Sequence, residues 1–175
     1  MSLANAVQSS GVIMPDAAYA ATSTGTNVID SQEIFNNHNR FLRLDLNISA
    51  VTTTVTGAGS SRLYLYVENF DPAGNRWVQA AMPTTLTQGI LSAVDAYSAT
   101  ASSITIGSTS VALPFSASIL IGAGLTYSVP TPVGGSQYSV AYNGVIAPRF
   151  RVRVVHLDVS SITTWNYSLG YTLGL

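Results

Sequence analysis

A strict two-residue alternation begins at residue 42, in the run Leu42-Arg43-Leu44-Asp45-Leu46-Asn47-Ile48. Every even-numbered position in this run is aliphatic, and every odd-numbered position is polar. Successive side chains of a β-strand point to opposite faces, so the pattern places one face against an apolar core and the other toward solvent. The run therefore predicts a half-buried β-strand, and with it a core built between sheets.

The next segment repeats the alternation and adds a turn. Leu63, Leu65 and Val67 form a second apolar row, and a short strand pattern returns at 77–80. Between them lies Asp71-Pro72-Ala73-Gly74-Asn75, where proline fixes φ and glycine permits a positive φ. The pattern predicts a hairpin formed by 62–68 and 77–80.

The second half of the chain carries further strand patterns. Residues 149–154 and 164–173 both alternate, and we expect 157–163 to join them as a hairpin loop. Two more hairpins are expected, in which residues 103–106 pair with 111–113 and residues 119–121 pair with 125–127. Short strands separated by Gly, Pro and Asn turns indicate an all-β fold, an antiparallel β-sandwich or jelly roll.

The amino-terminal part has a different character. Residues 1–37 show neither alternation nor a helical period, and they are rich in Ala, Ser, Thr and Asn. We expect them to form an extended N-terminal arm, followed by a β-sandwich domain over 38–175. Within that domain, the pattern at about 89–129 is blurred, and we interpret this segment as an insertion.

Charged side chains are unusually scarce. They make up 9% of the chain, against roughly 25% in soluble globular proteins. All seven basic residues are arginine, which suits planar, bidentate contacts at interfaces, whereas lysine mainly keeps free surfaces hydrated. Two interpretations follow. Either Ser, Thr and Asn side chains hydrate the surface, or neighbouring subunits cover it.

The totals also argue against several classes of partner. A formal net charge of −1 gives no strong attraction to nucleic acid or to an anionic membrane. The absence of cysteine removes disulfides, thiolate zinc sites and cysteine nucleophiles. The amino terminus lacks the basic start and apolar run of a signal peptide. We expect a soluble protein without an export signal, with neither nucleic acid nor membrane as a partner.

Residues suited to catalysis or metal binding are few and scattered. His38 lies in an Asn-rich turn and His156 follows an arginine-rich strand, so we interpret them as a turn residue and a hydrogen-bonded strand residue. Metal ligation needs convergent partners, which the sequence does not cluster. The eight carboxylates are spread along the chain, and no nucleophile elbow or phosphate loop is present. We expect no enzyme activity, no metal and no cofactor.

One row of charges is concentrated. Arg149, Arg151 and Arg153 alternate with apolar residues, so their guanidinium groups share one strand face at a spacing of about 7 Å. Such a row needs carboxylates opposite it. These belong either to the same sheet, with candidates Asp45, Glu68 and Asp158, or to a neighbouring subunit. Contact with nucleic acid is the weakest alternative, because three charges are a small footprint.

Tyrosines suggest a second class of function. Tyr64 and Tyr66 are predicted on the outward face of their strand, and the chain has nine tyrosines in all. Exposed aromatic rings can form platforms for sugars, so a carbohydrate-binding adhesion module is an alternative. Tyrosines on strands also serve as packing residues.

Three stretches together carry a likeness to a known group: Asn39 to Ile48, Leu65 to Trp77, and Pro148 to Val154 followed by Trp165 to Gly170. They resemble the small β-sandwich virion proteins of tailed bacteriophages, several of which are capsid decoration, or cement, proteins. The likeness covers less than half of the chain and brings no catalytic residues.

The resemblance implies a decoration protein that binds the major capsid protein on the outer head shell, as a trimer, after synthesis in the host bacterial cytoplasm. A head–tail connector or tail protein is the alternative in the same class. The expected contacts are the arm and an edge of the sandwich, through Met14, Tyr19, Ile29, Phe35, Arg149, Arg151 and Arg153.

Overall fold

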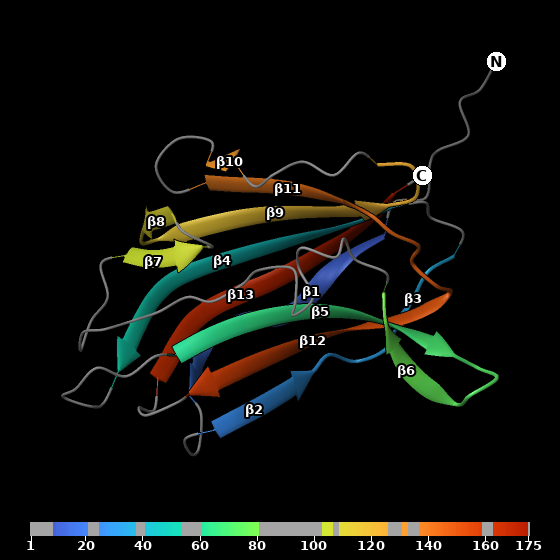
Figure 1. Cartoon of the computed structure of the whole chain (residues 1–175), viewed down its shortest axis with the longest axis horizontal. Helices are drawn as coiled ribbons and strands as arrows, with labels where there is room; N and C mark the ends of the chain where they lie inside the picture. The colour runs from blue at the N-terminus through green and yellow to red at the C-terminus, as the bar shows by residue number, and fades with distance from the viewer. Residues whose placement is uncertain are drawn as a thin grey trace.

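A computed structural model of the chain describes two facing β-sheets (Figure 1). The described residues are 9–20, 25–37, 41–53, 61–80, 103–106, 109–125, 131–132, 137–158 and 163–174. Their secondary structure consists of strands and turns, so the expected all-β fold class is confirmed.

The larger sheet has six strands (Figure 1). Its order is β1 (Ser9–Ala20), β13 (Thr163–Gly174), β4 (Phe41–Thr53), β9 (Phe115–Gly122), β11 (Gln137–Asn143) and β10 (Thr131–Pro132). Neighbouring strands in it are antiparallel, except that β9 and β11 are parallel. β1 is therefore an edge strand.

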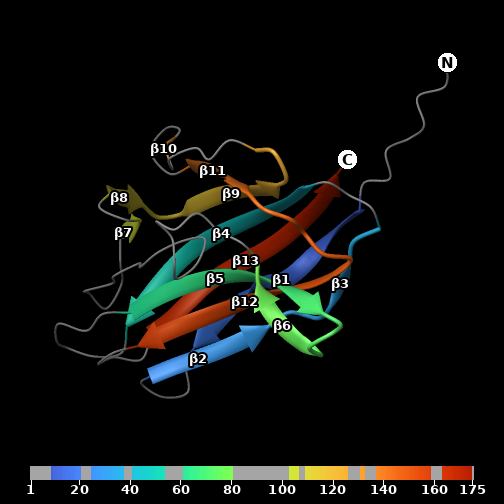
Figure 2. The ribbon, with the colours of Figure 1, turned by 45° about the vertical axis from the view of Figure 1, so that its right-hand side comes forward.

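The smaller sheet packs against one face of the larger one (Figure 2). Its order is β2 (Gly25–Asp30), β12 (Arg149–Asp158), β5 (Ser61–Asp71) and β6 (Arg76–Gln79), and β3 (Ile34–Phe35) pairs with the start of β12. β7 (Ser103–Ile106) and β8 (Thr109–Ala112) form a separate hairpin. The chain passes from one sheet to the other at β1–β2, β3–β4, β4–β5, β11–β12 and β12–β13, as in a jelly roll.

The core lies between the sheets and follows the alternation in the sequence. Leu42, Leu44, Leu46 and Ile48 of β4 are all buried, while Arg43 between them is exposed. The facing sheet contributes a matching set of buried residues: Leu63, Leu65, Val67, Phe150, Val152 and Val154. Removal of this apolar surface from water stabilises the sandwich, and it requires both sheets to be present.

Two predicted hairpins are confirmed, β5–β6 and β7–β8. In the first, the Asp71 carboxylate accepts a hydrogen bond from the Ala73 N–H at 3.0 Å. Asn75 takes a left-handed backbone conformation with φ of 47°. An aspartate that binds the backbone two residues on, followed by a residue that tolerates positive φ, is what this turn requires.

The prediction that β12 and β13 form a hairpin is wrong. β12 lies in the smaller sheet and β13 in the larger one, so their apolar rows face each other across the core. Alternation shows which side chains point inward, but it does not show which sheet a strand joins.

Two expectations for the middle of the chain also change. β9, inside the expected insertion at 89–129, pairs with β4 and β11 within the larger sheet. The predicted pairing of 119–121 with 125–127 is wrong for Ile119 to Ile121. These residues pair with 42–44 of β4 on one side and with 140–142 of β11 on the other. Residues 81–102 and 126–130 lie outside the described part.

The N-terminal arm prediction is wrong for the described residues 9–20 and 25–37, which form β1, β2 and β3 of the sandwich. The alternation is hidden in β1 because its pairing with β13 shifts register between Val12 and Met14, and again between Met14 and Ala17. A bulge adds an unpaired residue and so breaks the two-residue period.

The position of β1 in the sandwich predicts a stability difference within one strand. Met14 is buried in the core, whereas the nearby Val12 is exposed. We expect Met14→Ala to lower the free energy of unfolding by about 2 kcal/mol or more, because it leaves a cavity between the sheets. Val12→Ala is the matched control and should change the free energy by less than about 0.5 kcal/mol.

Urea unfolding followed by tryptophan fluorescence measures both variants. Equal, small effects would mean that residues 9–20 lie outside the cooperative core.

Candidate assembly interface

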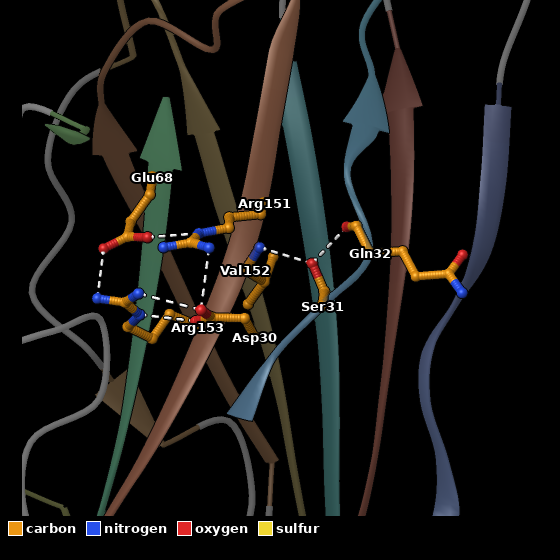
Figure 3. Close-up of polar contacts among 7 residues, drawn as sticks. All are labelled: Asp30, Ser31, Gln32, Glu68, Arg151, Val152 and Arg153. Carbon is orange, nitrogen blue, oxygen red and sulfur yellow. Dashed lines mark hydrogen bonds and ion pairs between the residues drawn. The ribbon is translucent and has the colours of Figure 1, made fainter. Parts of the chain in front are cut away.

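The arginine row lies on the outer face of the smaller sheet (Figure 3). Arg151 on β12 is directly opposite Glu68 on β5, and Arg153 is directly opposite Asp30 on β2. Directly opposed residues of antiparallel strands project to the same face, so flanking strands bring carboxylates to the arginines from both sides.

The side chains of Arg151, Arg153, Asp30 and Glu68 form a closed ring of ion pairs (Figure 3). Arg151 lies between two carboxylates, with its Nε 2.7 Å from Glu68 and its Nη1 2.9 Å from Asp30. Arg153 bridges the same two, with its Nε 2.7 Å from Asp30 and its Nη1 3.1 Å from Glu68. The Arg151 and Glu68 side chains are only 16% and 11% exposed, whereas those of Arg153 and Asp30 are 31% and 32% exposed, so solvent reaches one half of the ring.

Arg149 is neutralised separately. Its Nη2 donates to the Glu33 carboxylate at 2.7 Å, and its guanidinium carbon lies 4.0 Å from the centroid of the Phe70 ring. Arg151 is similarly placed 4.6 Å from the ring centroid of Trp77. The outer face therefore has arginines layered on aromatic rings, which holds the guanidinium planes in place.

The ion pairs of the ring shift the pKa values of Asp30 and Arg153 in the directions that favour the charged forms. The hydrogen bond from Arg153 lowers the pKa of Asp30 below its usual value, and the charges of Arg151 and Arg153 lower it further. The hydrogen bond to Asp30 in turn raises the pKa of Arg153. Asp30 and Arg153 therefore remain ionised at neutral pH.

Internal pairing of the arginine row was one of three open alternatives, and the structure bears it out for Glu68. Asp45, a second candidate, instead pairs with Arg43 at 2.9 Å on β4. The side chain of the third candidate, Asp158, lies outside the described part. Asp30 and Glu33 were missed because they fall in the segment that was expected to be an arm. A β-branched run at 28–29 before Asp30 was the available signal.

The other expected contact residues differ in exposure. Met14 is buried, and Tyr19 and Ile29 pack partly buried against the core. Phe35 on β3 is 60% exposed. Among the uncharged residues of that set, Phe35 alone presents a large free apolar surface.

Phe35 lines a hollow at the side of the sandwich where the edges of the two sheets lie. The hollow encloses about 510 Å³, and it is lined by Val12, Ile13, Ser31, Gln32, Glu33, Ile34, Phe35 and Tyr171. Val12 of the edge strand β1 is 72% exposed beside it. Glu33, the one charged residue in this lining, is already paired with Arg149. We call this surface the edge hollow.

The aromatic platform expected for a sugar-binding module is not available. Tyr64 is only 6% exposed, and its ring centroid is 6.3 Å from that of Tyr66. A ring that is buried within its own chain cannot stack on a sugar, which removes the main support for the adhesion alternative.

Histidines and metal-binding groups offer little further chemistry. His156 is buried and 3.2 Å from the Tyr167 hydroxyl, in line with its interpretation as a hydrogen-bonded strand residue. His38 lies outside the described part. No cluster of three or more His, Asp or Glu suited to a metal ion occurs among the described residues. In the same part of the chain, no helix has the length and apolar character needed to cross a membrane.

The low exposure of Arg151 and Glu68 predicts unequal costs for two arginine substitutions. We expect Arg151→Ala to lower the free energy of unfolding by about 2 kcal/mol, because it leaves Asp30 and Glu68 close together with one cation between them. Arg43→Ala removes an exposed pair on β4 and should cost less than about 1 kcal/mol.

Urea denaturation is the suitable measurement, since guanidinium would screen the charges. If both substitutions cost the same, the ring contributes no more than a surface ion pair.

Comparisons with known proteins give one structural likeness. No family model matches the chain, and no curated protein sequence matches it. A solved structure described as "Structure of infectious bursal disease virus Gx strain" is similar with a TM-score of 0.42 and 12% sequence identity. The similarity covers 97% of this chain and 32% of that one, so the chain spans about a third of its length.

Proposed function

We propose that the protein is a non-enzymatic structural component of a virion, which acts by packing against neighbouring protein subunits. More specifically, we propose a decoration protein that binds, as a trimer, to the major capsid protein on the outer head shell of a tailed phage. The observation that carries the proposal is an edge of the sandwich with exposed apolar side chains and almost no free charge.

The first support is electrostatic. The three arginines of β12 are all paired within the chain, and so are Arg43 and Arg76. A protein that relied on charge to remain apart from its neighbours would leave many such groups free. Internal pairing instead leaves a nearly neutral exterior, which can approach another subunit closely without burying unpaired charge.

The second support is the edge hollow. Val12 and Phe35 expose apolar surface there, and within the described part of the chain the 12-residue strand β1 pairs on one side only, with β13. Sheet edges present free backbone N–H and C=O groups, and natural proteins usually protect them with lysine or other charges. β1 carries one charge, Asp16, and one proline, so much of its edge remains open to a partner.

The proposed mechanism differs from an arm that becomes ordered on assembly. Since β1, β2 and β3 belong to the sandwich, the apolar edge exists before binding. A preformed surface loses less conformational entropy on association than a flexible segment does. Many copies on one shell then add their affinities through avidity.

The edge hollow predicts which substitutions abolish assembly. We expect the double variant Val12→Asp/Phe35→Asp to remain folded and to bind head shells at least about 30-fold more weakly, because each carboxylate is buried without a partner. Val78→Asp is the matched control, since Val78 is exposed on β6 outside the edge hollow. It should bind like the parent.

Co-sedimentation with empty head shells of a tailed phage that encodes this chain measures the binding, and sedimentation velocity measures the trimer. Unchanged binding of the double variant refutes the edge hollow as the contact. A parent protein that binds isolated connector or tail assemblies, and not shells, belongs to the head–tail alternative.

A further inference from the structure

A buried polar chain crosses the core between the two sheets. His156 of β12 is 2% exposed, and its Nε2 lies 3.2 Å from the hydroxyl oxygen of Tyr167 on β13. That hydroxyl donates to the Met14 sulfur on β1 at 3.3 Å. The chain therefore links the smaller sheet to β13 and then to the edge strand.

The order of donors assigns the proton on the imidazole. An N–H at Nδ1 would be buried without an acceptor, so the N–H of the neutral imidazole belongs at Nε2, where the Tyr167 oxygen accepts it and the hydroxyl donates to the Met14 sulfur. Neutral imidazole has one N–H, which leaves Nδ1 as the bare nitrogen. Nδ1 is buried and has no hydrogen-bond partner among the described residues. An added proton would thus be placed at a position without an acceptor.

The described groups packed around His156 do not compensate a positive charge. Its cross-strand neighbours are Leu63 on β5, which is apolar, and Asn27 on β2, which is uncharged. On the larger sheet it meets Tyr167, whose hydroxyl is neutral because burial raises its pKa.

Among the described residues, the other titratable groups beside this polar chain are Tyr19, whose pKa is raised by burial and by Asp16, and Asp16 itself, which is exposed on β1. On β12 itself, Arg153 projects to the opposite face, and the side chain of Asp158 lies outside the described part. Burial alone lowers the pKa of His156 from 6.5 to about 4.

The strand at the far end of this polar chain is weakly held at that point. Met14 lies between the two register shifts of β1, so its ladder with β13 is interrupted on both sides of the contact with Tyr167. Tyr19 of the same strand packs on the Tyr167 ring, with a centroid distance of 4.5 Å. Displacement of Tyr167 would therefore remove two of the side-chain contacts that anchor β1.

We propose that His156 is an acid-sensitive latch: neutral, it holds Tyr167 against β1, and protonated, it releases β1 from the sandwich and exposes the edge of β13. The inference is independent of the proposed function, since it concerns the core alone. In the released state the imidazole is hydrated and regains its ordinary proton affinity.

The sign follows from the lowered pKa. Between pH 6.5 and about 4, the closed state binds fewer protons than the released state, so stability is full above pH 6.5 and is lost as the pH falls toward 4. The difference of 2.5 pH units corresponds to a change of about 300-fold in the ratio of closed to released protein. The ion-paired Asp30 has a lowered pKa and stays charged over most of this window.

Hydrogen exchange of the full chain, read by mass spectrometry and corrected for intrinsic rates, tests the latch. From pH 7 to pH 4.5 we expect protection of residues 9–20 and 163–174 to fall on the order of 50-fold, while β4 and β9 change much less. His156→Gln, which keeps a neutral donor, should abolish this fall. His38→Gln changes the second histidine of the chain and should retain it.

A fall of the same size in His156→Gln overturns the proposal, as does equal loss of protection in every strand. Tyr167→Phe provides a second route if His156→Gln does not fold. It cuts the link to Met14 and keeps the imidazole, so β1 should already exchange faster at pH 7. Protection of β1 that stays unchanged in this variant also overturns the latch.

Discussion

The alternation along β12 is the constraint that the rest of the structure satisfies. Val152 and Val154 face the core, and Arg151 and Arg153, which alternate with them, place two guanidinium groups on the opposite face of one strand. Unpaired guanidinium groups so close together would repel, so β12 needs a carboxylate strand on each side. β5 supplies Glu68 and β2 supplies Asp30, and this requirement draws the amino-terminal segment into the sheet.

The same arrangement links the fold to the proposed role. The arginines of β12 pair with carboxylates on β2 and β5. These ion pairs hold the side chains on the outer face of the smaller sheet in place and leave the paired charges neutralised. Drawing β2 and β3 beside β12 also aligns the edges of the two sheets, and the edge hollow lies between them. The apolar surface at Val12 and Phe35 belongs to strands that are already held in the two sheets, so it is present before any partner binds.

Sequence patterns predicted the strands in which apolar and polar residues alternate regularly. They failed for strands with bulges and for pairings between residues far apart in the chain. β4, β5 and β12 were correctly predicted as strands, because their apolar rows are unbroken. β1 was missed because its bulges disrupt the period, and the parallel pairing of β9 with β11 depends on residues far apart in the chain. Of the interface, Glu68 was predicted as a partner of the arginines, but Asp30 was hidden in a strand that the pattern did not reveal.

The two faces of β12 respond differently to acid, and the difference follows from how completely their polar groups are satisfied. On the outer face, each guanidinium of the ring meets two carboxylates, and the pKa of Asp30 is lowered. On the inner face, His156 has one partner and a bare Nδ1. A half-satisfied polar group in a low-dielectric core is costly to charge. Acid therefore acts first on the inner face, at the contact that joins the two sheets, while the outer ring is still intact.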